Sequence, residues 1–363
     1  MIPFIDLFID RTSMYRLVLL YCAVLLLAAT GLAMAGLLPF DPAHLVFSTA
    51  VITLSCTATN WLFARVFNVP ANADSAMITA LVLALILSPV PPSDFISLGA
   101  IAMASVWAIA SKFLIAIYGK HIFNPAAMGV ALAALLLDAP GTWWVANPYL
   151  LPLVIAGGLL ISRKLHRTGT MLVLVLANLA TTMVLVKPAE WQFSITETLL
   201  HSPLLFMGFA MLTEPLTAPS GRWWRIVYAV LIGVLNAPSL KFGDMFVTPE
   251  LALLAGNLLA FVVNPKARLD LTLLRVEEIA RDAADFVFSS NRPLRFAAGQ
   301  YLEWTIPSRG HDARGNRRSF TIASAPSDSE LRLGVKFYSK PSTFKQALLA
   351  MQPGDRMVAG HLA

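Results

Sequence analysis

The sequence contains few charged residues and little cysteine. Only 13% of its 363 residues are charged and 57% are hydrophobic. An ordinary soluble domain carries about 25% charged residues, so this composition excludes that class. Cys22 and Cys56 both lie in apolar segments, where we expect buried small side chains. Two thiols imply no disulfide framework, and they argue against an iron–sulfur cluster held by this chain alone.

Long apolar runs replace the missing charge. A bilayer requires about 20 apolar residues per helix, and such runs recur until the mid-260s. After Lys266 the charges become dense and strand-like alternation begins, so we place a domain boundary there, between 1–265 and 266–363. The N-terminus lacks the features of a cleavable signal, which predicts that the first span is retained. The expected spans are 15–37, 44–64, 74–91, 96–118, 124–137, 147–162, 169–186, 203–214, 224–240 and 248–264.

The excess of basic residues also fits a membrane protein. The net charge is +6, but in such a protein this marks the cytoplasmic side, so we expect no nucleic-acid partner. Only Lys187 and Lys241 fall on the opposite side of the expected topology. A multi-pass protein of the inner (plasma) membrane with both termini in the cytoplasm is predicted. The residues that set this orientation are Arg11, Arg16, Arg65, Lys120, Arg163, Lys164, Arg167, Arg222, Arg225, Lys266 and Arg268.

Proline and polar residues interrupt the apolar pattern at corresponding places in two halves. Ala80–Pro92 and Leu204–Leu216 both run apolar and then meet a proline-containing break. Phe123–Ala126 aligns with Val247–Glu250 at an offset of about 124 residues. Five helices in each half would have opposite orientations, which predicts an inverted repeat of broken helices around a central site.

Charged and polar groups near these breaks are candidates for that site. Glu214 lies at a broken helix, where a functional role is expected because charge at membrane depth is costly. Lys112 has two interpretations: it extends to the cytoplasmic surface, or it belongs to the central site. His121 and Asn124 either cap the half-helix that follows them or contact a flavin.

Three segments of the first 265 residues resemble one family. Lys120–Ala127 reads Lys-His-Ile-Phe-Asn-Pro-Ala-Ala, and Asp74–Leu81 and Thr213–Pro215 support the same assignment. These segments resemble the NqrB/RnfD family, the membrane subunits of sodium-pumping NADH:quinone and Rnf electron-transfer complexes. The resemblance implies a flavin, often FMN bound covalently to a threonine in a Ser-Gly-Ala-Thr motif. The segment Lys187–Thr196 has no such motif. A non-covalent FMN or riboflavin in the membrane domain is therefore the expectation.

The C-terminal segment carries a second set of motifs. Ala298–Glu303 is followed by Arg318–Ser324, which reads Arg-Ser-Phe-Thr-Ile-Ala-Ser. Alternate residues of a strand face the same way, so Arg318 and Phe320 can address one ligand. The order resembles the antiparallel β-barrel of ferredoxin–NADP reductase-like domains and implies FAD. In this resemblance Arg318 pairs with the diphosphate, Phe320 stacks on the isoalloxazine, and Ser319 and Thr321 complete the motif, with the Thr321 hydroxyl near the redox nitrogen.

A second phosphate-binding turn is expected further along the chain. Ser342 and Thr343 open a predicted helix, and Pro353–Asp355 follows it. Ser342 is a good N-cap, and helix N-termini attract phosphate, although the same serine would also cap a helix without any ligand. The family pattern has glycine where this chain has Ser339. No glycine-rich dinucleotide fingerprint follows, so NAD(P)H binding is expected only in a longer chain or in a separate partner.

These features favour a membrane flavoprotein oxidoreductase without a metal site. Electrons would pass from cytosolic NAD(P)H through FAD to a quinone or an extracytoplasmic flavoprotein, with other electron-transport subunits as partners. A transporter or redox-coupled ion pump with a regulatory flavin domain is the alternative. A haem-containing ferric reductase is less favoured, because the histidines near span ends form no pair one helical repeat apart; they are His44, His121, His166 and His201. The sequence assigns no catalytic side chain.

Overall fold

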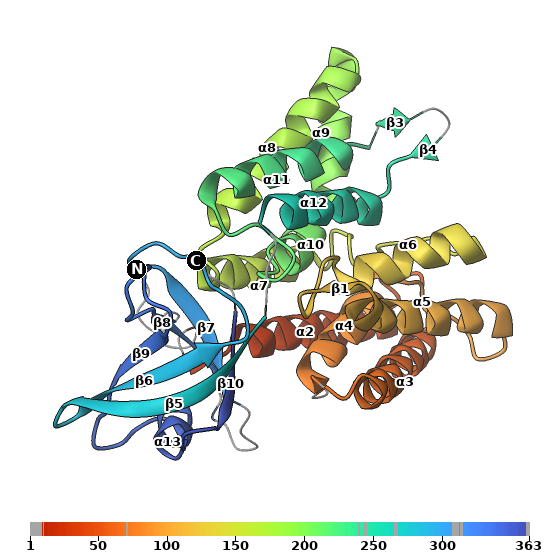
Figure 1. Ribbon diagram of the computed structural model, residues 1–363. Coiled ribbons are helices and arrows are strands. Elements are labelled where there is room, and N and C mark those ends of the chain that lie inside the picture. Colours follow the sequence, from red (N-terminus) through yellow and green to blue (C-terminus); the bar gives the residue numbers. More distant parts are fainter. Residues whose placement is uncertain are drawn as a thin grey trace. The chain divides into compact units, whose positions relative to one another are not determined.

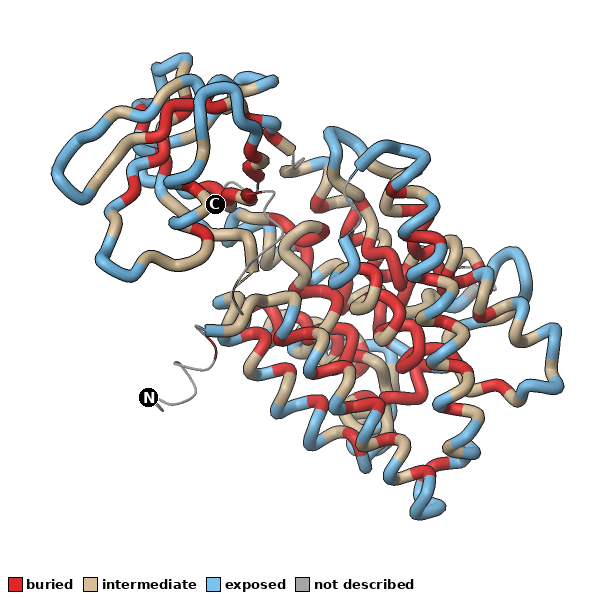
Figure 2. Tube along the Cα trace, turned by 90° about the horizontal axis from the view of Figure 1, so that it is seen from below, coloured by how far each residue is buried: buried red, intermediate tan, exposed pale blue. Residues whose placement is uncertain are grey.

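The computed structural model describes residue 9 and residues 11–69, 72–238, 240–242, 245–264, 268–306, 312 and 315–360. The chain divides into two compact units. The helical unit comprises Met14–Ala116 and His121–Asn264; the sheet unit comprises Met1–Ser13, Ile117–Lys120 and Pro265–Ala363. The predicted boundary at Lys266 falls outside the described residues. Figure 2 shows that each unit buries a core of its own.

The helical unit contains a helix in every range where a span was expected (Figure 1). The unpredicted α9 (Trp191–Leu200) lies between two of them. Before it comes the short helix η1 (Pro188–Glu190), and β1 (Ala116–Ile117), β2 (Lys120–His121), β3 (Lys241–Phe242) and β4 (Met245–Phe246) form two small hairpins. The other helices are α2 (Met14–Met34), α3 (Pro42–Val66), α4 (Ala73–Ile86), α5 (Phe95–Leu114), α6 (Pro125–Leu137), α7 (Leu151–Lys164), α8 (Thr168–Leu185), α10 (Leu204–Met207), η2 (Gly208–Leu212), α11 (Arg222–Leu235) and α12 (Pro249–Val263).

Helix length supports fewer spans than the ten predicted, and the full count stays a prediction. Within the described residues, four helices are both long and apolar enough to cross a bilayer: α2, α3, α5 and α8. A fifth is reached only if Pro188–Leu200 and Leu204–Leu212, bent by 48° at a break, count as one span. The apolar helices α4, α6 and α12 have 13 to 15 residues, and at about 1.5 Å per residue they fall short of a core about 30 Å thick.

Proline and the capping residues explain where α6 and α12 begin. Asn124 and Thr248 hold extended backbone directly before Pro125 and Pro249, where α6 and α12 begin. Proline suits the first helical position because its missing N–H would have no intrahelical partner there. These breaks, and the broken helices beside them, were predicted from the sequence.

Helix packing follows the same order in the two parts of this unit. Helix α3 packs on α5 and α5 on α6; further along the chain, α8 packs on α11 and α11 on α12. Glycine allows the close approach in both parts. A Cβ at Gly129 of α6 would lie 2.4 Å from the Ala104 carbonyl oxygen of α5, and one at Gly233 of α11 would lie 2.7 Å from the Leu174 oxygen of α8. This order is consistent with the predicted repeat, although its inversion stays a prediction.

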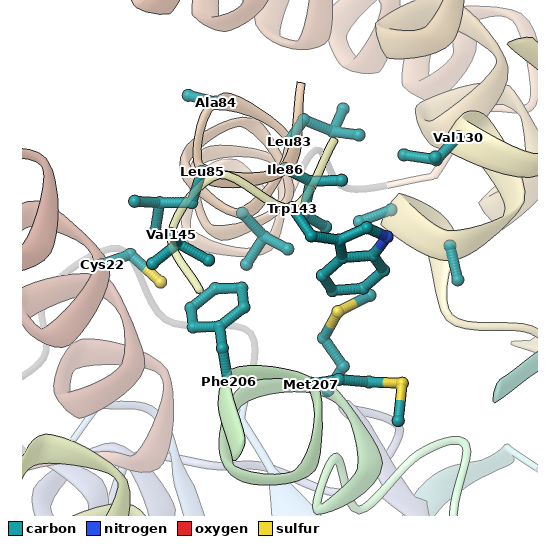
Figure 3. Close-up of a cluster of buried hydrophobic side chains, with 14 of the residues drawn as sticks. Cys22, Leu83, Ala84, Leu85, Ile86, Val130, Trp143, Val145, Phe206 and Met207 are labelled. Atoms are coloured by element: carbon teal, nitrogen blue, oxygen red, sulfur yellow. The ribbon is translucent and has the colours of Figure 1, made fainter. Parts of the chain in front are cut away.

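The interrupted end of α4 obtains its hydrogen bonds from a distant segment. The Ile86 oxygen accepts from the backbone N–H groups of Thr142 (3.0 Å) and Trp143 (2.9 Å). The Trp144 indole donates to the Ala84 and Leu87 oxygens at 3.0 and 2.9 Å. In Figure 3, Trp143 lies beside Ile86, with Phe206 and Met207 of α10 facing the same cluster. Carbonyl groups freed where a helix stops among apolar neighbours are thus satisfied by protein.

The sheet unit contains a six-stranded antiparallel sheet in the order β8-β7-β10-β5-β6-β9. Its core includes Leu302, Trp304 and Leu333 from the strands and Phe344 and Leu348 from α13 (Thr343–Leu349). The strands are β5 (Leu269–Ala280), β6 (Ala283–Ser290), β7 (Tyr301–Thr305), β8 (Arg317–Thr321), β9 (Leu331–Lys336) and β10 (Arg356–Gly360).

This arrangement corrects the predicted closed barrel. In the described part of the unit, no strand ladder joins the edge strands β8 and β9. A single backbone bond links the segments next to them, from the Ala323 N–H to the Arg332 oxygen at 3.0 Å. The apolar face is covered instead by α13, whose Phe344 and Leu348 are buried against the strands. Because a helix covers the core, the edges need not pair.

Candidate functional site

The flavin motif brings an arginine and two aromatic rings together in the sheet unit. Arg318 and Phe320 are two residues apart on β8 and both lie beside Phe344 of α13. The Arg318 guanidinium carbon is 5.6 Å from the Phe344 ring centroid, and the Phe320 and Phe344 centroids are 5.8 Å apart. The two motif residues therefore lie on one face of the strand, as the alternation requires.

Arg318 is held among acceptors of its own chain. Its side chain is 11% exposed. One terminal nitrogen donates to the Gly315 and Arg317 carbonyl oxygens, at 2.8 and 2.7 Å. The other donates to both carboxylate oxygens of Asp312, at 3.0 and 3.3 Å. Guanidinium groups bind both carboxylate and phosphate, so the nitrogen that faces Asp312 can donate to either anion.

The remaining motif residues occupy different positions. Ser319 and Thr321 are exposed, and the strand alternation sets them opposite Phe320. Ser342 caps α13, because its hydroxyl accepts from the Lys345 N–H at 3.4 Å. The Thr343 hydroxyl accepts from the Asp312 N–H at 3.1 Å. Asp312 thus connects Arg318 with Thr343, a link that the motifs did not indicate.

The helical unit holds a polar cluster around Glu214. One carboxylate oxygen of Glu214 accepts from the Asn124 amide at 3.0 Å and from the Thr217 hydroxyl at 3.2 Å. The other lies 3.6 Å from His121 Nε2. Asn124 also caps α6, accepting from the Ala127 N–H at 3.1 Å. The structure therefore brings three of the predicted residues together at the start of α6.

Two further buried polar residues of this unit were missed from the sequence, and one of them joins the cluster. Asn257 of α12 accepts from the Asn124 N–H at 2.8 Å and donates to the Tyr228 hydroxyl at 3.2 Å. The Trp143 indole donates to the carboxylate of Glu250 in the first turn of α12, at 3.1 Å. Asn257 and Glu250 are almost fully buried. A polar residue inside an apolar helix was the available signal.

Lys112 reaches α4. Its ammonium group donates to the Ser75 carbonyl oxygen at 2.9 Å, to the Ser75 hydroxyl at 3.1 Å and to the Thr79 hydroxyl at 2.8 Å. The side chain is partly buried. These bonds hold the ammonium group among the helices, which supports the second interpretation of this residue over extension to the membrane surface.

A small cavity adjoins both Glu214 and the partners of Lys112. It has a volume of about 50 Å³ and is lined by residues of α2, α4, α6, α7 and η2. Its polar lining is Ser75, Thr79, Asn124, Thr213 and Glu214. A cavity of this size holds a few waters, whereas ligand pockets have about 300 Å³ or more. A flavin at this position would require the helices to separate.

Comparison with known proteins finds a reductase segment. No protein-family model matches the chain. A segment of 76 residues is 37% identical to the reductase subunit of an aromatic O-demethylase from Amycolatopsis, covering 21% of this chain and 21% of that protein. The chain thus matches about a fifth of that relative's length.

Two crystal structures are also similar to parts of the chain. For the Amycolatopsis cytochrome P450 reductase GcoB, the identity is 31% over 26% of this chain and 28% of that one, with a TM-score of 0.24. A flavohemoglobin from Malassezia yamatoensis with bound FAD and haem is 16% identical. That match covers 73% of this chain and 62% of the flavohemoglobin, with a TM-score of 0.28. Of these findings, the 76-residue identity is the one with weight: part of this chain is similar in sequence to a reductase subunit.

Proposed function

We propose that the chain is a membrane flavoprotein oxidoreductase whose sheet unit binds FAD. The observation that carries this is the convergence of Arg318 and Phe320 on Phe344, since a flavin nucleotide needs a cation for its phosphates and an aromatic surface for its ring. The sequence identity with a reductase subunit supports the same function. Ser319, Thr321, Ser342 and Thr343 are the other residues proposed to line the site.

The protein's residues have separate roles in this proposal. Arg318 neutralises the flavin phosphate, and the Phe320 ring supports the isoalloxazine. Bound FAD would accept a hydride and release electrons singly. The proposed reductant is NAD(P)H, and the proposed acceptor is a quinone or an extracytoplasmic flavoprotein.

The helical unit is proposed as an NqrB/RnfD-like membrane domain of the inner membrane, with both chain termini in the cytoplasm. Four long apolar helices support insertion in a bilayer. The cluster formed by Lys112, Asn124 and Glu214 is the proposed central site, and a non-covalent FMN or riboflavin bound there would need a wider cavity than the one present.

Flavin analysis of the full chain tests the proposal. The protein is purified in detergent and denatured, and the released and retained flavins are identified by chromatography. We expect released FAD in the wild type and little FAD in Phe320→Ala. Phe286→Leu is the control for general loosening of the core, because Phe286 belongs to the same core but not to the Phe320–Phe344 ring pair. FAD retained equally by Phe320→Ala and the control would contradict the proposed site, and a wild type without flavin would contradict the function.

A second candidate is a transporter or redox-coupled ion pump. The polar cavity beside Glu214 favours it, because a water-sized space lined by a carboxylate and hydroxyls suits a small ion. Ion flux in vesicles separates the two functions. Flux that persists without reductant supports the transporter, flux that requires reductant supports the pump, and electron transfer without flux supports the oxidoreductase alone.

A further inference from the structure

Asp312 occupies a position that the motifs assign to the flavin phosphate. Both of its carboxylate oxygens face one Arg318 nitrogen, at 3.0 and 3.3 Å. Its own N–H donates to the Thr343 hydroxyl at 3.1 Å, and its carbonyl oxygen accepts from the Gly315 N–H at 2.9 Å. The Asp312 carboxylate is therefore held on Arg318 while its backbone N–H is held by Thr343, and both partners are among the groups proposed to bind phosphate.

Burial explains why an anion is needed there. The Arg318 side chain is 11% exposed, and a guanidinium buried to that extent is costly without a counter-charge. Its neighbour Phe344 offers the face of a ring but no anion. Carboxylate and phosphate make equivalent paired bonds to arginine, so the two anions can exchange at one guanidinium.

We propose that Asp312 is an internal counter-ion which takes the phosphate position on Arg318 in the flavin-free chain and exchanges with the flavin phosphate on binding. This rests on the proposed FAD site. The FMN phosphate and the FAD diphosphate each bring about two negative charges against one for the carboxylate, so FAD and FMN can displace Asp312. Riboflavin has no phosphate and leaves the Arg318–Asp312 pair in place. Asp312 therefore lowers the affinity for phosphorylated flavins while it stabilises the empty site.

Flavin titration of the stripped full chain in detergent tests this inference. We compare the wild type with Asp312→Asn, which keeps the side-chain size and removes the charge, and measure the quenching of flavin fluorescence. The variant should bind FAD and FMN about tenfold more tightly, a change of about 1.4 kcal/mol, with riboflavin affinity unchanged. Glu278→Gln is the matched control, because Glu278 is an exposed carboxylate of β5 in the same unit.

A second arm assigns the effect to Arg318. In the Arg318→Gln background, Asp312→Asn should no longer tighten FAD binding, because the pair that the charge acts through has been removed. Without flavin, Asp312→Asn should also lower the melting temperature of the full chain, since buried Arg318 then loses the charge of Asp312.

The outcomes distinguish this inference from the proposed function. Weaker FAD binding by Asp312→Asn would show that Asp312 orients Arg318 or contacts FAD itself, which would overturn the exchange. An equal change for riboflavin, or for Glu278→Gln, would also overturn it. If the wild type binds none of the three flavins, the FAD site itself fails.

Discussion

In the sheet unit, one network of arginines and carboxylates lies at the surface of β5 and β9, whereas in the helical unit Lys112 and Glu214 lie among helices. Arg275 donates to Glu330 through two nitrogens, at 2.7 and 2.8 Å, and Glu277 accepts from Arg275 and Arg332, at 2.7 Å each. These groups keep contact with solvent, so each loses little if its partner is removed. Glu214 has exchanged most of its solvent for Asn124, Thr217 and His121.

The two regions differ in what an ionic contact does. On the sheet the ion pairs join β5 with the segment of β9 across β6, and backbone ladders already hold β6 to both of these strands. Among the helices, Glu214 connects the start of α6 to the break after η2, where a proline leaves no continuous backbone ladder. We therefore expect a charged side chain to contribute strongly to stability where the backbone ladder is interrupted, and weakly where the ladder continues.

Removing the buried carboxylate should have the largest effect. Glu214→Ala leaves the Asn124 amide and the Thr217 hydroxyl without their acceptor, and buried unsatisfied groups cost about 1–3 kcal/mol each. We expect a loss of about 3 kcal/mol in unfolding free energy, measured by denaturing-detergent titration with circular dichroism. Glu214→Gln keeps one acceptor oxygen and should lose less. Equal losses for the two variants would mean that volume, not hydrogen bonding, determines stability here.

Disturbing the contact of α5 with α6 should rank next. Gly129→Ala places a methyl group 2.4 Å from the Ala104 oxygen and 2.7 Å from the Ala108 Cβ, so the helices must separate. Overpacking of this kind costs about 1–3 kcal/mol, which the same titration measures. Gly31→Ala in α2 is the control, because nothing lies within 4 Å of its added Cβ. It should stabilise by about 0.5–1 kcal/mol through helix propensity. Equal changes in unfolding free energy for Gly129→Ala and Gly31→Ala would contradict close packing of α5 on α6.

The sequence predicted local features better than distant ones. The breaks before Pro125 and Pro249 could be read because proline and its capping residue act within a few positions. The shared face of Arg318 and Phe320 followed from strand alternation. By contrast, the bond between Asn124 and Asn257 joins residues 133 positions apart, and no local pattern specifies such a pair.

The errors have physical causes as well. Apolar runs predicted spans wherever hydrophobicity persisted, although α4, α6 and α12 have only 13 to 15 residues, and α6 and α12 begin only at Pro125 and Pro249. The barrel was inferred from strand alternation, which does not show whether a sheet closes or whether a helix such as α13 covers its face. Asp312 was missed because a single carboxylate in a loop carries no motif; only its contact with Arg318 reveals it.

The surface ion pairs should give the smallest effect, and one that depends on pH. The bonds from Arg275 hold the pKa of Glu330 below its ordinary value, and those from Arg275 and then Arg332 do the same for Glu277. A carboxylate with a lowered pKa stabilises the fold above its unfolded pKa of about 4.3, and this contribution disappears as pH falls through the folded pKa. The melting temperature of the sheet unit within the full chain should therefore fall slightly below about pH 4.3, and Glu330→Gln should reduce that slope. At high salt the difference between variant and wild type should shrink, because exposed charges are screened. A large loss of stability in Glu330→Gln at neutral pH would mean that these surface ion pairs contribute as much to stability as the contacts of Glu214. The two units would then not differ in what their ionic contacts do.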